Sequence, residues 1–204
     1  MSLGRQLSLF GVEGRPASPL DFEGLLAGAG QVVRMGGTAR VSIVVDQPWR
    51  ARALLAEASA RGLAATCERV TGERATGEPG GVDGHICFRT AYSSALAALG
   101  ASWLRGAVKH PPPGFALDGR RLRLWAIAAG ERDGASAFAL KLGVSDEPMW
   151  GVVGAALAAV GLPPVLLGPR AGGPAYRIVG RRRLARLIEL VGDPPAGVTG
   201  ENWI

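Results

Sequence analysis

Lysine is almost absent from this 204-residue chain, whose 23 basic residues are 21 arginines and two lysines, Lys109 and Lys141. Cysteine and histidine are equally scarce, with two residues of each type. Two cysteines provide neither a disulfide framework nor metal-ligand spacing, which excludes disulfide-rich folds and zinc modules. Because neither His85 nor His110 stands near a cysteine or an acidic cluster, the sequence predicts no catalytic triad, no metal site and no cofactor.

A membrane segment is also missing. Residues 149–168 are uncharged and long enough to span a bilayer, but they are mostly alanine and glycine, and Pro163-Pro164 interrupts them. A buried helix followed by a strand fits this stretch better. The N-terminus lacks the basic and then apolar run of a signal peptide. We therefore expect a protein without membrane contact, located in the cytoplasm and associated with the nucleoid.

The composition indicates a folded, basic protein. Hydrophobic residues make up 48% of the chain and charged residues 20%, which suits a buried core. The net charge of +6 favours a polyanionic partner. Arginine in place of lysine, together with abundant alanine and glycine, is typical of a GC-rich genome, so the arginine count alone is weak evidence. The positions of the arginines are more informative.

Residues 1–18 are rich in glycine and charge, yet they contain the apolar pentapeptide Gln6-Leu7-Ser8-Leu9-Phe10. Such a stretch is too polar to pack by itself, so we predict a flexible tail. Leucine and phenylalanine exposed on a tail are typical of a segment that binds another protein.

The pentapeptide resembles the bacterial sliding-clamp-binding motif at all five positions. The resemblance implies that Leu9 and Phe10 fill one apolar pocket of the replication clamp and that Leu7 fills a shallower site. It also implies that the Gln6 amide bonds to the clamp main chain, and Ser8 stands where the motif takes serine or aspartate. Because a disordered peptide loses entropy on docking, two apolar anchors would support roughly micromolar affinity.

The rest of the chain repeats itself. Residues 41–62 and 138–161 share one pattern, in which a strand leads into Asp-x-Pro and an apolar helix ends at glycine. We predict that Asp46 and Asp146 cap these helices at their N-termini. Two such elements at matching positions indicate an internal duplication.

The flanks extend this duplication. An apolar helix that ends in glycine precedes each repeated strand, and two strands and a last helix follow. The expected helices and strands on these flanks cover residues 20–30, 31–35, 64–70, 85–89 and 91–100, then 122–130, 165–170, 176–179 and 181–192. The sequence therefore predicts an α/β (α+β) protein with two pseudo-symmetric αββαββα halves.

This order resembles the LAGLIDADG homing-endonuclease fold in its single-chain form. The resemblance implies halves at 19–100 and 118–192, signature helices that pack along a pseudo-twofold axis, and sheets that form a saddle for DNA. A proline-stiffened connector (101–117) and a C-terminal tail (193–204) complete the expected organisation. A chain with two internal halves has little need of a second copy, so we expect a monomer.

The nucleases of this fold carry one carboxylate near the end of each signature helix, and the pair holds metal against the scissile phosphates. When the closing glycines are aligned, Ala29 and Ala129 take those positions, and alanine cannot bind a metal ion. A shift of one residue gives Gln31 and Glu131, which is still a single carboxylate. The resemblance therefore implies a scaffold without catalytic residues.

Strand alternation predicts which cations face DNA. In residues 40–45, Val41, Ile43 and Val45 point to the helices. Arg40 and Ser42 therefore point to the open sheet face, as do Lys141 and Arg177 in the second half. Arginines at strand ends fall near the same saddle. Arginines at the start of the last helix oppose its dipole, which indicates an anionic partner there. The predicted DNA-contacting set is Arg34, Arg40, Arg89, Arg132, Lys141, Arg170, Arg177, Arg181, Arg182 and Arg183. Such cations neutralise phosphates, which makes affinity strongly salt-dependent.

These observations favour a non-catalytic accessory protein of DNA replication or repair that is recruited to the sliding clamp and binds double-stranded or branched DNA. Three alternatives stay open. An endonuclease could use a rearranged metal site at Glu131 and Asp133. A transcription regulator similar to WhiA is disfavoured because the chain ends too soon after the last helix for a helix-turn-helix. A clamp adaptor could lack DNA binding.

Overall fold

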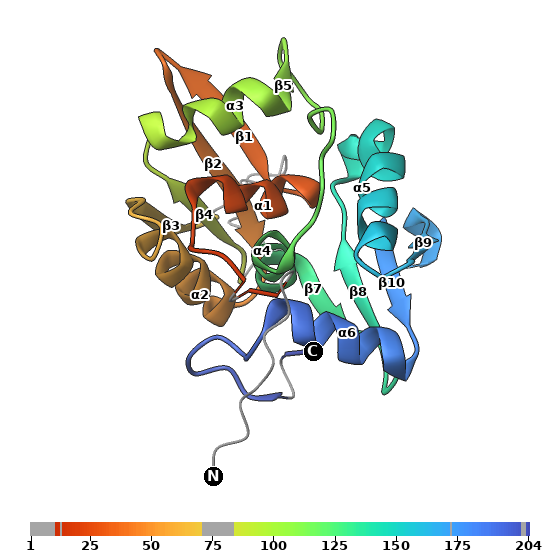
Figure 1. Ribbon diagram of the computed structural model, residues 1–204. Coiled ribbons are helices and arrows are strands. Elements are labelled where there is room, and N and C mark those ends of the chain that lie inside the picture. Colours follow the sequence, from red (N-terminus) through yellow and green to blue (C-terminus); the bar gives the residue numbers. More distant parts are fainter. Residues whose placement is uncertain (1–10, 13, 71–83, 172, 201–202) are drawn as a thin grey trace, which may run out of the picture.

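The computed structural model describes residues 11–12, 14–70, 84–171, 173–200 and 203–204. Two halves follow one another along the chain with the same order of elements (Figure 1). The first half consists of α1 (Glu23–Ala27), β1 (Gln31–Met35), β2 (Thr38–Val45), α2 (Pro48–Ser59), β3 (Ala65–Arg69), β4 (Ile86–Thr90) and α3 (Ala97–Trp103). The second consists of α4 (Gly119–Ala129), β7 (Gly130–Arg132), β8 (Ala137–Lys141), α5 (Glu147–Ala159), β9 (Val165–Leu167), β10 (Ala175–Val179) and α6 (Arg181–Val191). The predicted αββαββα order is confirmed. Short 3₁₀ turns at Pro19–Phe22, Ser94–Leu96 and Val144–Asp146 lead into α1, α3 and α5, and a fourth at Pro169–Ala171 follows β9.

Each half builds one four-stranded antiparallel sheet. The strand orders are β1-β2-β4-β3 and β7-β8-β10-β9, which are the same permutation. In β2 the residues Ala39, Val41, Ile43 and Val45 are buried against helices, and the alternate residues are more exposed. Gly36 and Gly37 take positive φ angles in the two-residue turn between β1 and β2, which suits a hairpin of the type I′ class. One face of each sheet is therefore left uncovered by helices.

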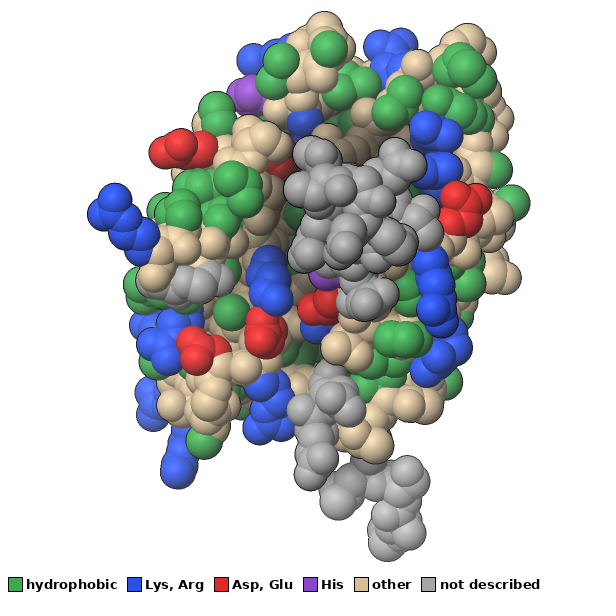
Figure 2. All heavy atoms as spheres, turned by 180° about the vertical axis from the view of Figure 1, so that it is seen from behind, with side chains coloured by type: hydrophobic (Ala, Val, Ile, Leu, Met, Phe, Trp, Pro, Cys, Tyr) green, Lys and Arg blue, Asp and Glu red, His purple; other side chains and the backbone are tan. Residues whose placement is uncertain are grey.

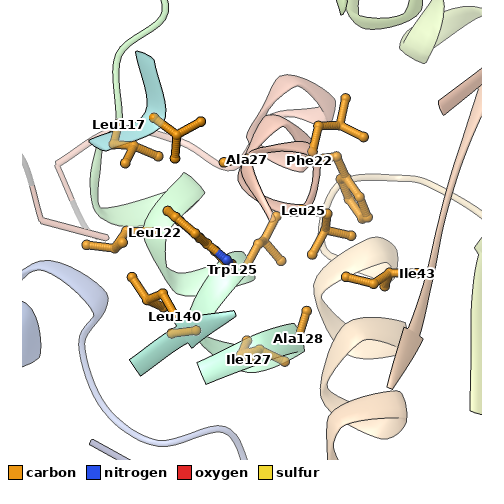
Figure 3. Packing of buried hydrophobic residues seen from close by; sticks show 14 of the residues in the cluster. Phe22, Leu25, Ala27, Ile43, Leu117, Leu122, Trp125, Ile127, Ala128 and Leu140 are labelled. Carbon is orange, nitrogen blue, oxygen red and sulfur yellow. The ribbon is translucent and has the colours of Figure 1, made fainter. Parts of the chain in front are cut away.

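The short helix α1 and the longer α4 pack against each other at the centre of the molecule, and glycine sets their spacing. A Cβ atom on Gly24 would lie 1.9 Å from the Arg121 carbonyl oxygen, and one on Gly28 would lie 2.6 Å from Trp125 Nε1. Around this contact the side chains form a continuous core (Figure 3), which includes Phe22, Leu25, Leu122, Trp125, Ile127 and Leu140. The two helices thus pack against each other, as the resemblance implies for the signature helices.

The end of the first half differs from the prediction. The sequence pattern places a helix end at Gly100, whereas α3 continues to Trp103, which is fully buried. Gly100 does not close the helix but allows close packing, because a Cβ there would lie 2.7 Å from Ala39 Cβ. The connector after it is more than a stiff linker, since β5 (Leu104–Arg105) and β6 (Val108–Lys109) pair as a small hairpin.

The uncharged stretch 149–168 forms most of α5 and all of β9, as the sequence predicts. Within the described ranges, no helix has both the length and the apolar character that a bilayer crossing requires.

Both ends of the described chain are attached to the domain. The Val12 amide donates to the Leu190 carbonyl at 2.9 Å, and Arg15 pairs with Asp118 at 2.7 Å. The part of the predicted flexible tail that the structure describes is therefore packed. The pentapeptide Gln6–Phe10 lies outside the described residues. Near the other end, the indole of Trp203 is buried and donates to the Gly192 carbonyl at 3.4 Å.

A buried charge network joins the two halves at the side of the molecule where α2, α4 and α6 meet. Arg61 and Asp21 pair at 2.9 Å with both side chains fully buried. Glu57 accepts from Arg61 and from Arg123, the latter at 2.7 Å. Arg123 also donates to the Val191 carbonyl at 2.8 Å, so the network reaches the end of α6.

Candidate nucleic-acid interface

The C-terminal ends of α1 and α4 meet at the pseudo-twofold axis, and each end binds a cation. Lys109 Nζ donates to the Gly28 carbonyl at 2.9 Å and to the Gly30 carbonyl at 2.7 Å. The Arg50 guanidinium donates to the Ile127 carbonyl at 2.7 Å and to the Gly130 carbonyl at 2.6 Å. The last carbonyls of a helix have no partner within it and carry its negative dipole end, so a cation is favoured there.

Each of these cations also pairs with an aspartate from the repeated Asp-x-Pro segment. Arg50 Nε lies 3.0 Å from Asp46 Oδ1, and Lys109 Nζ lies 2.7 Å from Asp146 Oδ2. Burial lowers the pKa of the Lys109 amine below its ordinary value, although the Asp146 carboxylate opposes this. Burial likewise lowers the pKa of Arg50, and Asp46 again acts in the opposite direction.

The prediction that these two aspartates cap their helices is wrong for Asp46, because Gln47 is the N-cap residue of α2. Asp146 is the N-cap residue of α5, as predicted, but its side chain makes no capping bond. Each carboxylate instead pairs with the cation that binds the C-terminal end of a central helix: Asp46 with Arg50 at α4, and Asp146 with Lys109 at α1. The contacts cross between the halves, because Arg50 of the first half closes α4, and Asp146 of the second half holds the lysine that closes α1.

Alanine side chains line a hollow of about 220 Å³ at this axis. Ala29 and Ala129, the positions that the resemblance assigns to the nuclease acids when the closing glycines are aligned, belong to its wall, as do Asp46 and Lys141. Within the described ranges, no three His, Cys, Asp or Glu side chains converge in a way that could hold a metal ion. Glu131 pairs with Lys141 Nζ at 2.8 Å, and it lines one hollow with Asp46 and another with Asp133.

On the second sheet, the predicted outward cations do lie on the open face. Phe138, Leu140 and Ile178 are buried on the helix side, and Lys141 and Arg177 point the other way. Sequence alternation did not reveal that both are already paired, Lys141 with Glu131 and Arg177 with Asp133. The second half therefore presents half-exposed ion pairs here.

On the first sheet, Arg40 and Arg89 lie on the open face. The Arg40 guanidinium stacks 4.8 Å from the centre of the Tyr92 ring. Arg89 stands opposite Ser42 in the strand register, and its contact with Glu68 is loose, at 3.9 Å. Seen from behind, Lys and Arg side chains stand along both flanks of the molecule, with Asp and Glu among them (Figure 2).

Five of the predicted cations lie away from this open face. Arg34 is opposite Ala39 in the strand register, and its side chain packs beside Gly100 of α3, so it belongs to the helix side. Arg132 is opposite the buried Phe138 and donates to the Gly200 carbonyl at 3.1 Å. Arg181, Arg182 and Arg183 form the first turn of α6 and are exposed. Because α6 packs on α4 in the helical layer (Figure 1), these three arginines do not lie on the sheet surface.

The remaining predicted cation, Arg170, lies in the 3₁₀ turn after β9 and is exposed.

Sequence reasoning missed Arg50 and Lys109 as parts of the axis. Arg50 follows Asp46 by one helical turn, which is a signal for a local ion pair. The carbonyl groups that these cations bind are 77 and 81 residues away in sequence, and no local pattern marks such contacts.

No protein-family model matches the chain, and no curated protein matches its sequence. Its structure is similar to that of the homing endonuclease I-WcaI bound to its DNA recognition sequence, with a TM-score of 0.58 and 12% identity over 94% of this chain and 90% of that chain. It is also similar to the N-terminal LAGLIDADG domain of DUF199/WhiA, with a TM-score of 0.54 and 11% identity over 87% of this chain and 82% of that chain. The chain thus has the two-half LAGLIDADG fold.

Proposed function

We propose that the protein is a non-catalytic DNA-binding accessory factor that the replication sliding clamp recruits through residues 6–10. The non-catalytic role is supported by the axis, where Lys109 and Arg50 bind the helix ends and alanines, Ala29 and Ala129, stand at the positions that the resemblance assigns to the acids. A divalent metal ion would meet two cations there, and the nearby carboxylates of Asp46 and Asp146 are already paired with those cations.

Support for DNA binding comes from the fold and the open face. The similar homing endonuclease I-WcaI is bound to its DNA recognition sequence, and Arg40 and Arg89 stand on the uncovered sheet face of this chain. The support is uneven between the halves, because Lys141 and Arg177 are each paired with a neighbouring acid. We infer that the first half supplies most of the phosphate contacts.

The clamp proposal rests on the pentapeptide. The segment after it is fixed to the domain by Val12 and Arg15, so the peptide would leave the domain from a fixed point. Attachment to a clamp that encircles DNA raises the effective DNA concentration to roughly millimolar, so weak open-face contacts would suffice.

The clamp test is a pulldown of purified sliding clamp by the full chain, with Phe10→Ala as the variant and Leu3→Ala as the control from the same segment. We expect Phe10→Ala to abolish capture and Leu3→Ala to preserve it, because only Phe10 belongs to the motif. Equal capture by native chain and Phe10→Ala would refute recruitment through this peptide.

The DNA test compares arginines on opposite faces of one sheet. We expect Arg40→Ala and Arg89→Ala each to weaken duplex binding several-fold and to reduce the slope of log affinity against log salt by about 1. Arg34→Ala, on the helix side, is the matched control and should leave the slope unchanged. Identical slopes for all three variants would place the DNA on another surface.

The endonuclease alternative predicts the opposite result for one variant. Glu131→Gln would free Lys141, so the proposed scaffold should bind DNA more tightly and cleave none. A nuclease that uses Glu131 should instead show Mg²⁺-dependent cleavage that this variant loses. Assays on duplex, nicked and branched DNA separate the two outcomes.

The likeness to the WhiA domain favours a transcription regulator as the second candidate. A regulator should select one sequence from a random duplex library, whereas the accessory factor should enrich none.

A further inference from the structure

A second hollow, of about 290 Å³, lies beside the hollow at the axis. Asp46 and Arg50 belong to the walls of both. Glu131, on the wall of the second hollow, pairs with Lys141, on the wall of the first, at 2.8 Å. The second hollow therefore lies between the start of α2 and β7, the edge strand of the second sheet, and adjoins the surface proposed to hold DNA.

Aromatic rings form the apolar part of the wall of this second hollow. The rings of Trp49 and Trp203 lie 6.5 Å apart with their planes at 81°, and Phe138 belongs to the same wall. Trp203 and Phe138 are buried, whereas Trp49 is half-buried. The Arg50 guanidinium lies 4.6 Å from the centre of the Trp49 ring and helps to hold it in place. A partly exposed indole that its neighbours hold is a surface on which another planar ring can stack.

The polar part of the wall has its opposite charges already paired. Asp46 pairs with Arg50 at 3.0 Å, and Glu131 pairs with Lys141. The Gln47 side chain is exposed on the same wall and makes no capping bond to α2, so its amide can both donate to a ligand and accept from one. Such a lining favours a neutral, planar ligand with hydrogen-bonding groups on its edge.

The repeat shows that the fold does not require these side chains. The sequence Asp46-Gln-Pro-Trp49 of the first half corresponds to Asp146-Glu-Pro-Met149 of the second. Met149 is 2% exposed and packs in the core. A partly exposed tryptophan next to an exposed amide is therefore a property of the first half alone.

We propose that this hollow holds one nucleobase displaced from the DNA duplex. The inference rests on the proposed function, because the base would belong to DNA bound across the open faces. Bases are the neutral, planar groups of DNA, and they carry donors and acceptors on their edges. A displaced base would stack on Trp49 and bond through its edge to Gln47. Arg132, exposed on the same wall, would neutralise the phosphate of that nucleotide.

This arrangement determines which DNA the protein prefers. Removal of a base from the stack costs free energy, and the cost is least for a base without a pairing partner. The protein should therefore bind DNA that contains an unpaired base more tightly than a fully paired duplex.

The test compares two labelled duplexes that differ by a single unpaired adenine, with the affinity of the full chain for each measured by fluorescence anisotropy. We expect the native chain to bind the duplex with the unpaired adenine on the order of tenfold more tightly. Trp49→Met, which introduces the residue of the second half, and Gln47→Ala should each bring the ratio of the two affinities close to 1. Gln47→Ala changes an exposed side chain, so it tests the hollow even where Trp49→Met fails to fold.

The control is Arg40→Ala, because loss of an open-face cation should weaken binding of both duplexes and leave their ratio unchanged. Equal affinity of the native chain for the two duplexes would overturn the inference and leave the DNA-binding proposal standing. Absence of binding to either duplex would refute DNA binding itself, and this inference with it. A preference that both hollow variants retain would mean that the chain recognises the easier bending of the interrupted duplex, which also overturns the role of the hollow.

Discussion

Lys109 is one of two lysines in the chain, and its amine makes three polar contacts. Its side chain is 4% exposed, and it binds two carbonyl groups and one carboxylate. Lysine suits this place because its ammonium group has three donors on a flexible stem. The amine therefore satisfies the end of α1 and the Asp146 charge at the same time.

Replacement of this amine should be costly. Lys109→Met keeps the apolar stem but leaves the Asp146 carboxylate buried without a partner, so we expect unfolding free energy to fall by about 3 kcal/mol or more. The second change Asp146→Asn should recover part of that loss, because it removes the orphaned charge. Urea unfolding of the two single variants and the double variant measures the coupling. A double variant less stable than Lys109→Met would contradict this view of the pair.

Residues whose role depends on local pattern were predictable, and those whose role depends on distant contacts were not. The period of two in a strand placed Arg40, Lys141 and Arg177 on the open face. The same reasoning cannot show that Asp133 lies beside Arg177, nor that Asp46 serves a cation instead of a helix N-terminus.

At the scale of elements, the contact between α1 and α4 depends on the absence of side chains. The Gly24 position has no room for a methyl group against the Arg121 backbone, and backbone atoms cannot rotate away as a side chain can. The helix spacing is therefore set by glycine.

Gly24→Ala should destabilise the protein by about 2–3 kcal/mol, because the helices must separate to admit the methyl group. The matched control is Gly151→Ala in α5, where an added Cβ would meet no atom within 4 Å. In dilute protein this control should gain about 0.5–1 kcal/mol from its better helix propensity. Thermal unfolding of both variants provides the comparison, and equal midpoints would show that the spacing is adjustable.

The order of elements was predictable because helices ended by glycine and strands bounded by turns leave strong local signals. The hairpin of β5 and β6 was not, since strands of two residues have no measurable period. The end of α3 was misjudged because Gly100 has the residue type of a cap but serves close packing. The order of helices and strands along the chain was enough to indicate the shared fold, although the sequence identity to the similar structures is near the level of unrelated chains.

At the scale of the whole molecule, the buried charged side chains connect the two halves. The network of Arg61, Asp21, Glu57 and Arg123 links α2 of the first half to α4 and α6 of the second. Burial disfavours the charged form of Glu57, but the hydrogen bonds from Arg123 and Arg61 outweigh it and hold the pKa of Glu57 below its ordinary value of 4.5.

The Glu57 carboxylate therefore stabilises the folded protein above pH 4.5, and this contribution is lost as the pH falls through its lower folded pKa. Glu57→Gln should reduce unfolding free energy by about 1–3 kcal/mol at neutral pH. The difference from native protein should shrink as the pH falls below 4.5 and native Glu57 becomes protonated at its lowered pKa. Urea unfolding at several pH values gives this curve. A difference independent of pH would mean that Glu57 contributes by packing alone.

Arg50 and Lys109, the cations that bind the ends of α4 and α1, connect the two halves, so separation of the halves would break contacts of both cations. The residue aligned with Arg50 in the second half is Trp150, and the cation for α1 comes from the connector hairpin. Two copies of the first half would each have an arginine for the helix end of the other. Two copies of the second half would have none, because Trp150 stands at that position, so the two repeats are not interchangeable.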